Sequence, residues 1–158
     1  MQSHNAARYK EVLGHFATGV TVITGCYLSK DYGFTCQSFM ALSLDPQLVL
    51  FAASKSSTSF PAIRDCGYCC INILSLGQES IARTFSIRGA NKFNGLGYTR
   101  GLNGSPKIND CLAWIEAKLH DVREVGDHYV VVCEVLELSL GQGKPLIYYR
   151  GGFGGFEV

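Results

Sequence analysis

The side chains best suited to hold a ligand are short hydroxyls gathered between residues 33 and 59. One group lies around an apolar-rich segment and consists of Thr35, Ser38 and Ser43. The other follows the next apolar segment and consists of Ser54, Ser56, Ser57, Thr58 and Ser59, with Lys55 among them. Hydroxyls, free backbone N–H groups and one ammonium suit a phosphate or polyol chain held without a metal. A solvated loop capping a helix that begins near Ser59 explains the same residues, because Ser and Thr are favoured at helix N-caps.

Cysteine is the other reactive residue type, and its pattern indicates free thiols. The seven, an odd number, are Cys26, Cys36, Cys66, Cys69, Cys70, Cys111 and Cys133. Most lie in apolar segments, where a thiol packs as a small hydrophobic group. Residues 66–69 match C-x-x-C, but a zinc site needs a second ligand pair, and a redox motif would open a helix whereas this one enters an expected strand. We therefore expect no metal and a reduced, cytoplasmic protein.

Composition narrows the class of protein. The 158 residues are 47% hydrophobic and only 17% charged, with a net charge of +1. This length predicts one domain over residues 1–158, and the low charged fraction suggests a surface covered by a second copy. The near-zero charge argues against nucleic acid or an acidic membrane as a partner. No segment approaches the roughly 18 apolar residues of a membrane span, and we expect no signal peptide.

Periodicity predicts the elements that must position these residues. Helical spacing predicts helices over residues 4–16, 59–64 and 78–85. Alternating or β-branched segments predict strands at 18–25, 34–42, 48–53, 68–74, 111–122, 128–139 and 146–149. Turns are expected at 29–33, 45–46 and 124–127, and the glycine-rich segments 86–109 and 150–156 are expected to be irregular. Closely spaced strands with peripheral helices predict a mainly β fold, a small closed or half-closed antiparallel barrel with Greek-key-like connections.

Five short motifs, taken together and in their order along the chain, resemble those of the flavin reductase family. Its members are the small reductase components of two-component flavin monooxygenases. They lie at residues 17–24, 37–50, 55–57, 126–128 and 145–151. The resemblance runs from about Tyr9 to Phe153 and implies the FMN-binding split-barrel fold. It also implies an NAD(P)H-dependent flavin reductase that supplies reduced flavin to a separate oxygenase, and a homodimer whose sites borrow residues from the other copy.

The resemblance implies two groups of site residues. The flavin-binding residues would be Thr35, Cys36, Gln37, Ser38, Phe39, Ala53, Ser54, Lys55, Ser56, Ser59, Phe60, Phe85, Ser86 and Arg88. The nicotinamide-binding residues would be His128, Tyr149, Arg150, Gly151, Gly152 and Phe153. Gln37 and Ser54 depart from the family's usual Ser and Asn. His128 read alone is equally consistent with a solvated turn residue, and Trp114 with simple packing.

Hydride transfer explains why the sequence lacks an evident catalytic constellation. The reaction is carried by nicotinamide and flavin, so the protein supplies positioning and no acid, base or nucleophile. Backbone N–H groups near residues 35–39 could stabilise negative charge on the reduced ring. The sequence leaves FMN or FAD, and NADH or NADPH, open. A flavin-binding sensor without turnover and a pyridoxamine-phosphate-oxidase-like enzyme are the alternatives on the same barrel.

Overall fold

The structure is a computed structural model that describes residues 5–89 and 91–157. Its helices are α1 (Ala6–Leu13), α2 (Phe60–Cys66) and α3 (Glu79–Phe85), with a 3-10 helix η1 (Leu76–Gln78). Its strands are β1 (Thr18–Gly19), β2 (Thr21–Tyr27), β3 (Lys30–Cys36), β4 (Phe39–Leu44), β5 (Gln47–Ser54), β6 (Tyr68–Ile73), β7 (Tyr98–Arg100), β8 (Pro106–Ile108), β9 (Ala113–Val125), β10 (His128–Leu140), β11 (Leu146–Tyr149) and β12 (Gly152–Gly155).

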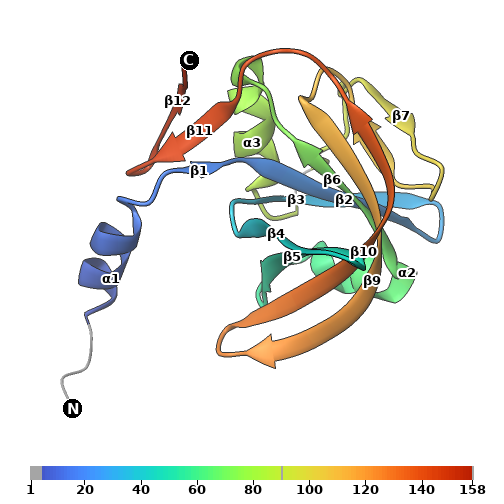
Figure 1. Ribbon diagram of the computed structural model, residues 1–158, viewed down its shortest axis with the longest axis horizontal. Coiled ribbons are helices and arrows are strands. Elements are labelled where there is room, and N and C mark those ends of the chain that lie inside the picture. The colour runs from blue at the N-terminus through green and yellow to red at the C-terminus, as the bar shows by residue number, and fades with distance from the viewer. Residues whose placement is uncertain (1–4, 90, 158) are drawn as a thin grey trace.

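Seven strands form one antiparallel sheet that closes on itself. Their order is β3-β2-β6-β9-β10-β5-β4, so β3 and β4 are the two edges. These edge strands follow one another in the chain with only Gln37 and Ser38 between them. Because two residues cannot span an open seven-stranded sheet, the sheet must curl until its edges approach. We call the place where β3 and β4 approach each other the seam; near it, the Ala52 N–H donates to Ser38 O at 3.0 Å. Figure 1 shows the curled sheet. The predicted antiparallel barrel is confirmed.

Two apolar clusters lie on either side of the sheet. Inside the barrel, β5 alternates so that Val49, Phe51 and Ala53 are buried, and α2 adds Phe60 and Ile63. The second cluster lies under α3, where Phe85 and Ala82 meet Val20, Val22 and Leu74 of the sheet. Gly33 allows this approach, because a Cβ there would lie 2.7 Å from the Phe85 ring. The middle of β3 is therefore fixed against the end of α3, close to the barrel rim.

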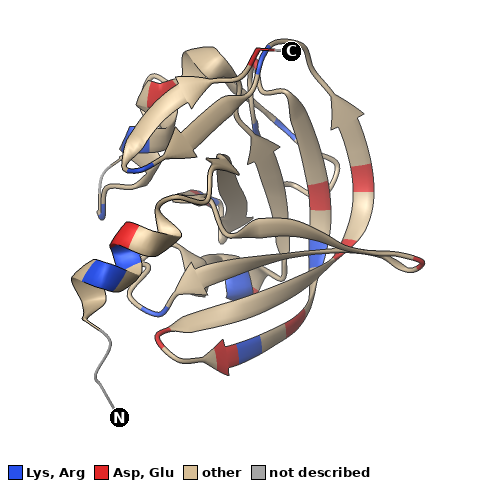
Figure 2. Ribbon diagram, turned by 60° about the vertical axis from the view of Figure 1, so that its left-hand side comes forward, with Lys and Arg blue, Asp and Glu red and all other residues tan. Residues whose placement is uncertain are grey.

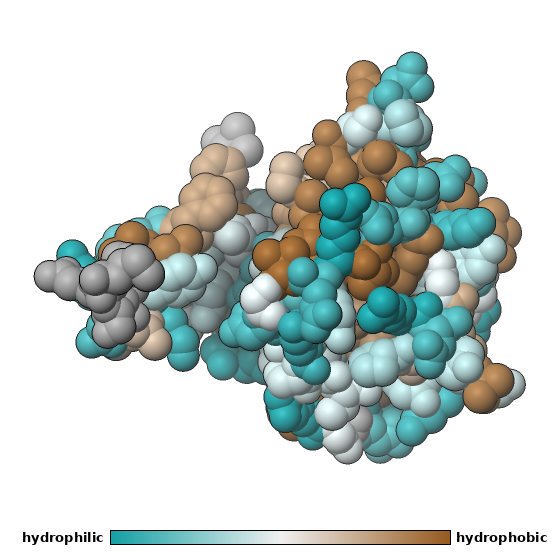
Figure 3. All heavy atoms as spheres, turned by 90° about the horizontal axis from the view of Figure 1, so that it is seen from below, coloured by the Kyte–Doolittle hydropathy of each residue, from teal (hydrophilic) through white to brown (hydrophobic). Residues whose placement is uncertain are grey.

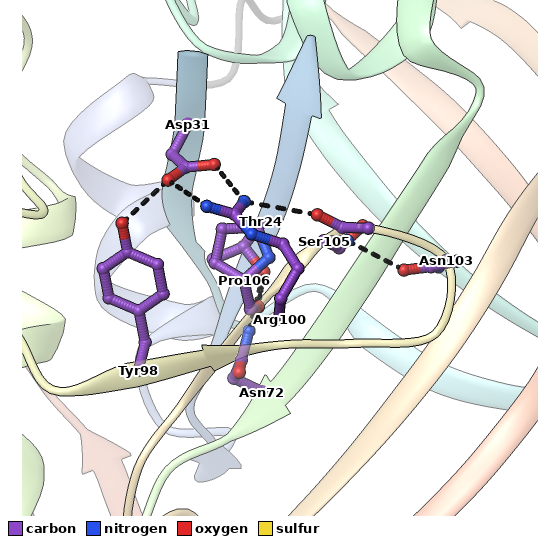
Figure 4. A network of polar contacts seen from close by, with 9 residues as sticks. Thr24, Asp31, Asn72, Tyr98, Arg100, Asn103, Ser105 and Pro106 are labelled. Carbon is purple, nitrogen blue, oxygen red and sulfur yellow. Dashed lines mark hydrogen bonds and ion pairs between the residues drawn. The ribbon is translucent and has the colours of Figure 1, made fainter. Parts of the chain in front are cut away.

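The segment 86–109, expected to be irregular, contains the hairpin β7–β8. Side chains from the sheet hold it in place (Figure 4). Buried Asn72 accepts a hydrogen bond from the Ile108 N–H at 2.8 Å, and the Thr24 hydroxyl donates to Pro106 O at 2.6 Å. At the other end, Asp31 accepts from the Tyr98 hydroxyl at 2.8 Å and pairs with Arg100. The prediction that residues 86–109 are wholly irregular was therefore wrong. Strands of only three residues, held by partners far away in the chain, leave no periodicity in the sequence.

Three further boundaries differ from the sequence-based expectation. The strand expected over 34–42 is interrupted at Gln37 and Ser38, where the chain crosses from one barrel edge to the other. The turn expected at 29–33 lies earlier, because Leu28 and Ser29 adopt positive φ and β3 begins at Lys30. The glycine-rich tail forms β12, which pairs with β11 through backbone bonds that need no side chain. The turn at residues 45–46 is confirmed, and the Asn5 side chain caps α1 by accepting from the Ala7 N–H; the first residue of the helix expected over 4–16 lies outside the described residues.

The small sheet β1-β11-β12 and α1 form an arm beside the barrel (Figure 1). The Arg150 N–H donates to Gly14 O at 3.0 Å and joins α1 to the β11–β12 turn. No residue of α1 is buried, although Tyr9, Val12 and Leu13 are apolar. Figure 3 shows the end of the molecule that carries α1 projecting from the rest, with hydrophobic area on both. The arm therefore exposes an apolar face within the single chain.

Charged side chains are sparse and of mixed sign. Figure 2 shows Lys, Arg, Asp and Glu scattered over the ribbon without one strongly charged face. No helix within residues 5–89 and 91–157 is long and apolar enough to pass through a bilayer.

Candidate functional site

A cavity of about 280 Å³ lies at the barrel rim, where the break between β3 and β4 faces the end of β5. The end of α3 and the segment that follows it form its other wall. Its lining consists of Phe34, Thr35, Cys36, Gln37, Ser38, Ala52, Ser54, Ser56, Ser57, Thr58, Phe85, Ser86, Ile87, Arg88, Lys92 and His128. We call this the rim cavity.

The rim cavity gathers many of the residues that the sequence singled out. From the predicted flavin-binding group it contains Thr35, Cys36, Gln37, Ser38, Ser54, Ser56, Phe85, Ser86 and Arg88. From the predicted nicotinamide-binding group it contains His128. Segments some 90 residues apart in the chain thus meet here, as the resemblance to the family implied.

Five predicted flavin-binding residues do not line the rim cavity. Ala53 and Phe60 are each only 1% exposed and face the barrel core, and Phe39 packs against the same core cluster. Lys55 Nζ lies 2.6 Å from Glu124 Oε1 and so ties the β9–β10 hairpin to the end of β5. Ser59 is buried and its hydroxyl donates to Gly33 O at 2.9 Å. In each case packing or an internal partner occupies the side chain that the motif suggested for a ligand.

The remaining predicted nicotinamide-binding residues lie on the arm and not at the rim cavity of the same chain. They are Tyr149, Arg150, Gly151, Gly152 and Phe153, in and around the β11–β12 turn. The Phe153 ring lies 5.2 Å from that of Tyr148 and 5.0 Å from the Arg83 guanidinium. Tyr149 is exposed and meets His15 edge to face. Their role stays a prediction, and within one chain the structure does not bring them to the cavity.

Most hydroxyls of the rim cavity already have partners in the protein. The Thr35 hydroxyl donates to Ala82 O at 2.6 Å, and Ser54 Oγ lies 2.8 Å from Ser56 Oγ. Ser57 Oγ accepts from the N–H groups of Ser59 and Phe60, so this loop caps the start of α2 through Ser57. The stretch therefore caps a helix, as one explanation expected, and it also lines a cavity, while its role in holding a ligand stays a prediction.

The charge of the rim cavity is positive. Among the described residues, its lining includes Arg88 and Lys92 but no Asp or Glu. Lys92 Nζ donates to Gly33 O at 2.8 Å and Phe85 O at 3.2 Å, and lies 3.5 Å from Ser59 Oγ. All three acceptors are neutral, and partial burial lowers the pKa of Lys92. Sequence reasoning missed Lys92, since its partners lie 7 to 59 residues away and no local pattern marks it.

His128 begins β10 and pairs in register with Ser54 of β5, and both residues line the rim cavity. Its Nδ1 lies 2.7 Å from Asp127 Oδ1, and this hydrogen bond lowers the pKa of Asp127. The carboxylate orients the imidazole and leaves Nε2 available to a ligand.

The cavity's thiol is unsuited to nucleophilic or redox chemistry. Burial raises the pKa of Cys36 to about 11, so the thiol is protonated at neutral pH. All seven cysteines are free, and C-x-x-C does run from the end of α2 into β6 as predicted. Within the described part of the chain, no cluster of three or more His, Cys, Asp or Glu residues could hold a metal.

The chain is a closed antiparallel barrel with a cationic, hydroxyl-lined cavity at its rim, a lining suited to an anionic, polar ligand. Comparison with known proteins gives the family. Residues 13–157 match the family described as "Flavin reductase like domain". The reductase subunit HsaB of a flavin-dependent monooxygenase from Rhodococcus jostii is 43% identical over 151 residues, covering 95% of this chain and 77% of HsaB.

Two solved structures share the fold. Component B of nitrilotriacetate monooxygenase from Mycobacterium thermoresistibile has a TM-score of 0.92 and 44% identity, covering 96% of this chain and 86% of the other. The NADH:FAD oxidoreductase SgcE6 of Streptomyces globisporus, in complex with NAD and FAD fragments, has a TM-score of 0.92 and 28% identity, covering 99% and 96%. The chain belongs to the flavin reductase family. The predicted family, split-barrel fold and enzyme class are confirmed.

Proposed function

We propose that this chain transfers hydride from NADH to a flavin held in the rim cavity and releases the reduced flavin to a separate oxygenase. The main observation in support of a flavin site is the set of residues that line the cavity. It combines hydroxyls, two cations and no carboxylate among the described lining residues, which suits the ribityl chain and phosphate of a flavin. The family and the reductase subunits among its relatives support the reaction and the oxygenase partner.

We assign the residues of the cavity to two parts of the bound flavin. Gln37 and Ser38, at the barrel seam, would lie along the flat ring, with His128 on the nicotinamide side. Arg88 and Lys92 would face the phosphate. Hydride transfer between the stacked rings is chemistry that the two bound molecules supply. The protein orients them and provides no nucleophile, because Cys36 is held as a protonated thiol.

We further propose that the working form is a homodimer in the cytoplasm. The outer side of β4 exposes Met40, Leu42 and Leu44, and the arm exposes Tyr9 and Phe16. Apolar area of this kind is covered in stable assemblies. In a dimer, the β11–β12 turn of one copy could approach the rim cavity of the other, which would reconcile the position of that turn with its predicted nicotinamide role. Seven free thiols agree with a reducing compartment.

Steady-state assays test the reaction. The purified protein is mixed with NADH or NADPH and with riboflavin, FMN or FAD, and nicotinamide absorbance is followed. We expect flavin-dependent oxidation of NADH. A bound flavin without turnover would instead favour the sensor hypothesis, and turnover of pyridoxamine phosphate in place of nicotinamide would favour the oxidase-like one. Sedimentation of the protein at assay concentrations tests the dimer.

A further inference from the structure

The outer side of the barrel has a cavity of about 370 Å³ that shares no lining residue with the rim cavity. It lies where the loop between β7 and β8 covers β6, β9 and β10. Ala117, next to Glu116, belongs to the cluster inside the barrel, so alternation along β9 places Glu116 on the outer side. We call this the outer cavity, and its lining consists of Tyr68, Leu102, Asn103, Glu116, Leu136 and Glu137.

Glu116 is a buried carboxylate with little to balance its charge. The residue is only 2% exposed. Among the described residues, its carboxylate accepts one hydrogen bond, from the Asn103 N–H to Oε1 at 3.0 Å, and forms no ion pair. A carboxylate removed from water normally has a cationic partner or several donors. Glu116 therefore has room for a cationic partner, and the outer cavity gives that partner access.

The loop over Glu116 is shaped to fit this carboxylate. Gly101 leaves space for it, because a Cβ there would lie 2.5 Å from Glu116 Oε1. Asn103 Nδ2 donates to Cys69 O at 2.9 Å and to Ala117 O at 3.3 Å, which ties the loop to the sheet. The carboxylate is thus held at the wall of the cavity before any ligand arrives.

A second carboxylate faces the same space. Glu137 of β10 pairs in register with Glu116 of β9, at an irregularity in the ladder that leaves Leu136 unpaired. Both glutamates line the cavity, and like charges directly opposite each other on a sheet are unfavourable unless a cation compensates them. Leu102 is 88% exposed and Leu136 is 45% exposed, so apolar side chains border the acidic pair.

Two lysines on this side of the sheet do not supply the missing charge. Lys107 Nζ lies 3.3 Å from Ser139 Oγ and is directed over the Trp114 ring. Lys118 follows on β9 and is exposed. Neither lysine lines the outer cavity, and neither forms an ion pair with a described residue.

We propose that the outer cavity binds a small organic cation, a primary ammonium group on a short apolar body. The ammonium lies between Glu116 and Glu137, and the apolar body lies against Leu102 and Leu136. An ammonium donates three hydrogen bonds and suits two carboxylates, whereas calcium takes six to eight oxygen ligands. The cavity has the size and the mixture of apolar walls and few polar groups that small-molecule sites show. This site goes beyond the proposed flavin reaction and does not depend on it.

Calorimetric titration of the full chain with benzylammonium tests the proposal, with benzyl alcohol as the uncharged ligand of similar shape. We expect saturable binding of benzylammonium, at least about tenfold tighter than that of benzyl alcohol. Glu137→Gln changes an exposed residue and should weaken benzylammonium at least about fivefold. Glu116→Gln keeps an acceptor for the Asn103 N–H and should weaken it at least about tenfold. Glu134→Gln is the matched control, since Glu134 is exposed on β10 but does not line the cavity, and should leave binding unchanged.

Three results would overturn the proposal. They are no saturable binding of benzylammonium by the unmodified chain up to about 10 mM, equal binding of benzyl alcohol, and binding that neither Glu137→Gln nor Glu116→Gln weakens. If Glu116 served only to hold the loop, benzylammonium would not raise the unfolding temperature of the unmodified chain, and this result would also count against the site. Flavin affinity should be the same in all three variants, because the two cavities share no residue, so a failure here leaves the proposed function intact.

Discussion

Ser38→Trp tests the position of the flavin ring most directly. Ser38 lies at the seam between β3 and β4, where its side chain is exposed and lines the rim cavity. An indole there should not disturb the core, but it would take up a large part of a cavity of about 280 Å³. We expect flavin affinity to fall by at least about tenfold, which corresponds to ~1.4 kcal/mol of binding free energy. Fluorescence titration with riboflavin, FMN and FAD measures it.

The control is Ser80→Trp, which places the same side chain on exposed Ser80 of α3, outside the rim cavity. Both variants should unfold at the temperature of the unmodified chain, because neither serine is buried. If Ser38→Trp binds each flavin as tightly as Ser80→Trp does, the ring does not lie against the seam and the proposed site is refuted.

Three other substitutions separate the roles of the remaining residues. His128→Ala should raise the KM for NADH more than it weakens flavin binding, because His128 lies at the end assigned to nicotinamide; equal effects on both would remove it from that role. Lys92→Met should weaken FMN but not riboflavin, and should lower the unfolding free energy by about 1–2 kcal/mol, since Gly33 O loses a charged donor; an equal loss for both flavins would contradict the phosphate assignment. Burial alone would raise the pKa of Asp31, but hydrogen bonds from Arg100 and Tyr98 prevail and hold it below its ordinary value of 3.8. The stabilisation from Asp31 is therefore complete above that ordinary value and is lost as pH falls through the lowered pKa, so Asp31→Asn should cost about 1 kcal/mol in urea unfolding at about pH 7 and progressively less as the pH is lowered below 3.8. A cost independent of pH would show that the carboxylate charge is not responsible.

The barrel could be predicted because its signals are local. In β5, alternation of Val49, Phe51 and Ala53 marks an inward face, and the turn at residues 45–46 separates β4 from β5. The break at Gln37 and Ser38 could not be predicted in the same way. The residues on both sides favour extended backbone, and only closure of the sheet makes the chain change edges there.

The site residues show the same difference between positions set by local sequence and positions set by distant contacts. Motif residues such as Ser38, at the seam, and Ser54, at the end of β5, line the cavity because short segments fix their positions. Lys55 and Ser59 belong to the same stretch but have partners elsewhere, Glu124 on the β9–β10 hairpin and Gly33 on β3. Lys92 contributes a charge to the cavity from a segment without any motif. Contacts between distant segments decided each of these cases, and a single sequence does not encode their geometry locally.

The internal hydrogen bonds of the rim cavity bear on how a reductase can release its product. Ser54 pairs with Ser56, Thr35 donates to Ala82 O, and Lys92 already has neutral acceptors. A flavin that binds here must exchange some of these bonds for its own, so each new contact contributes less than an unpaired donor would. If the proposed site is correct, the cavity would select a flavin phosphate by shape and charge while limiting the gain in binding free energy. Moderate affinity is what transfer of reduced flavin to a separate oxygenase requires, because a tightly held product would limit turnover by its own release.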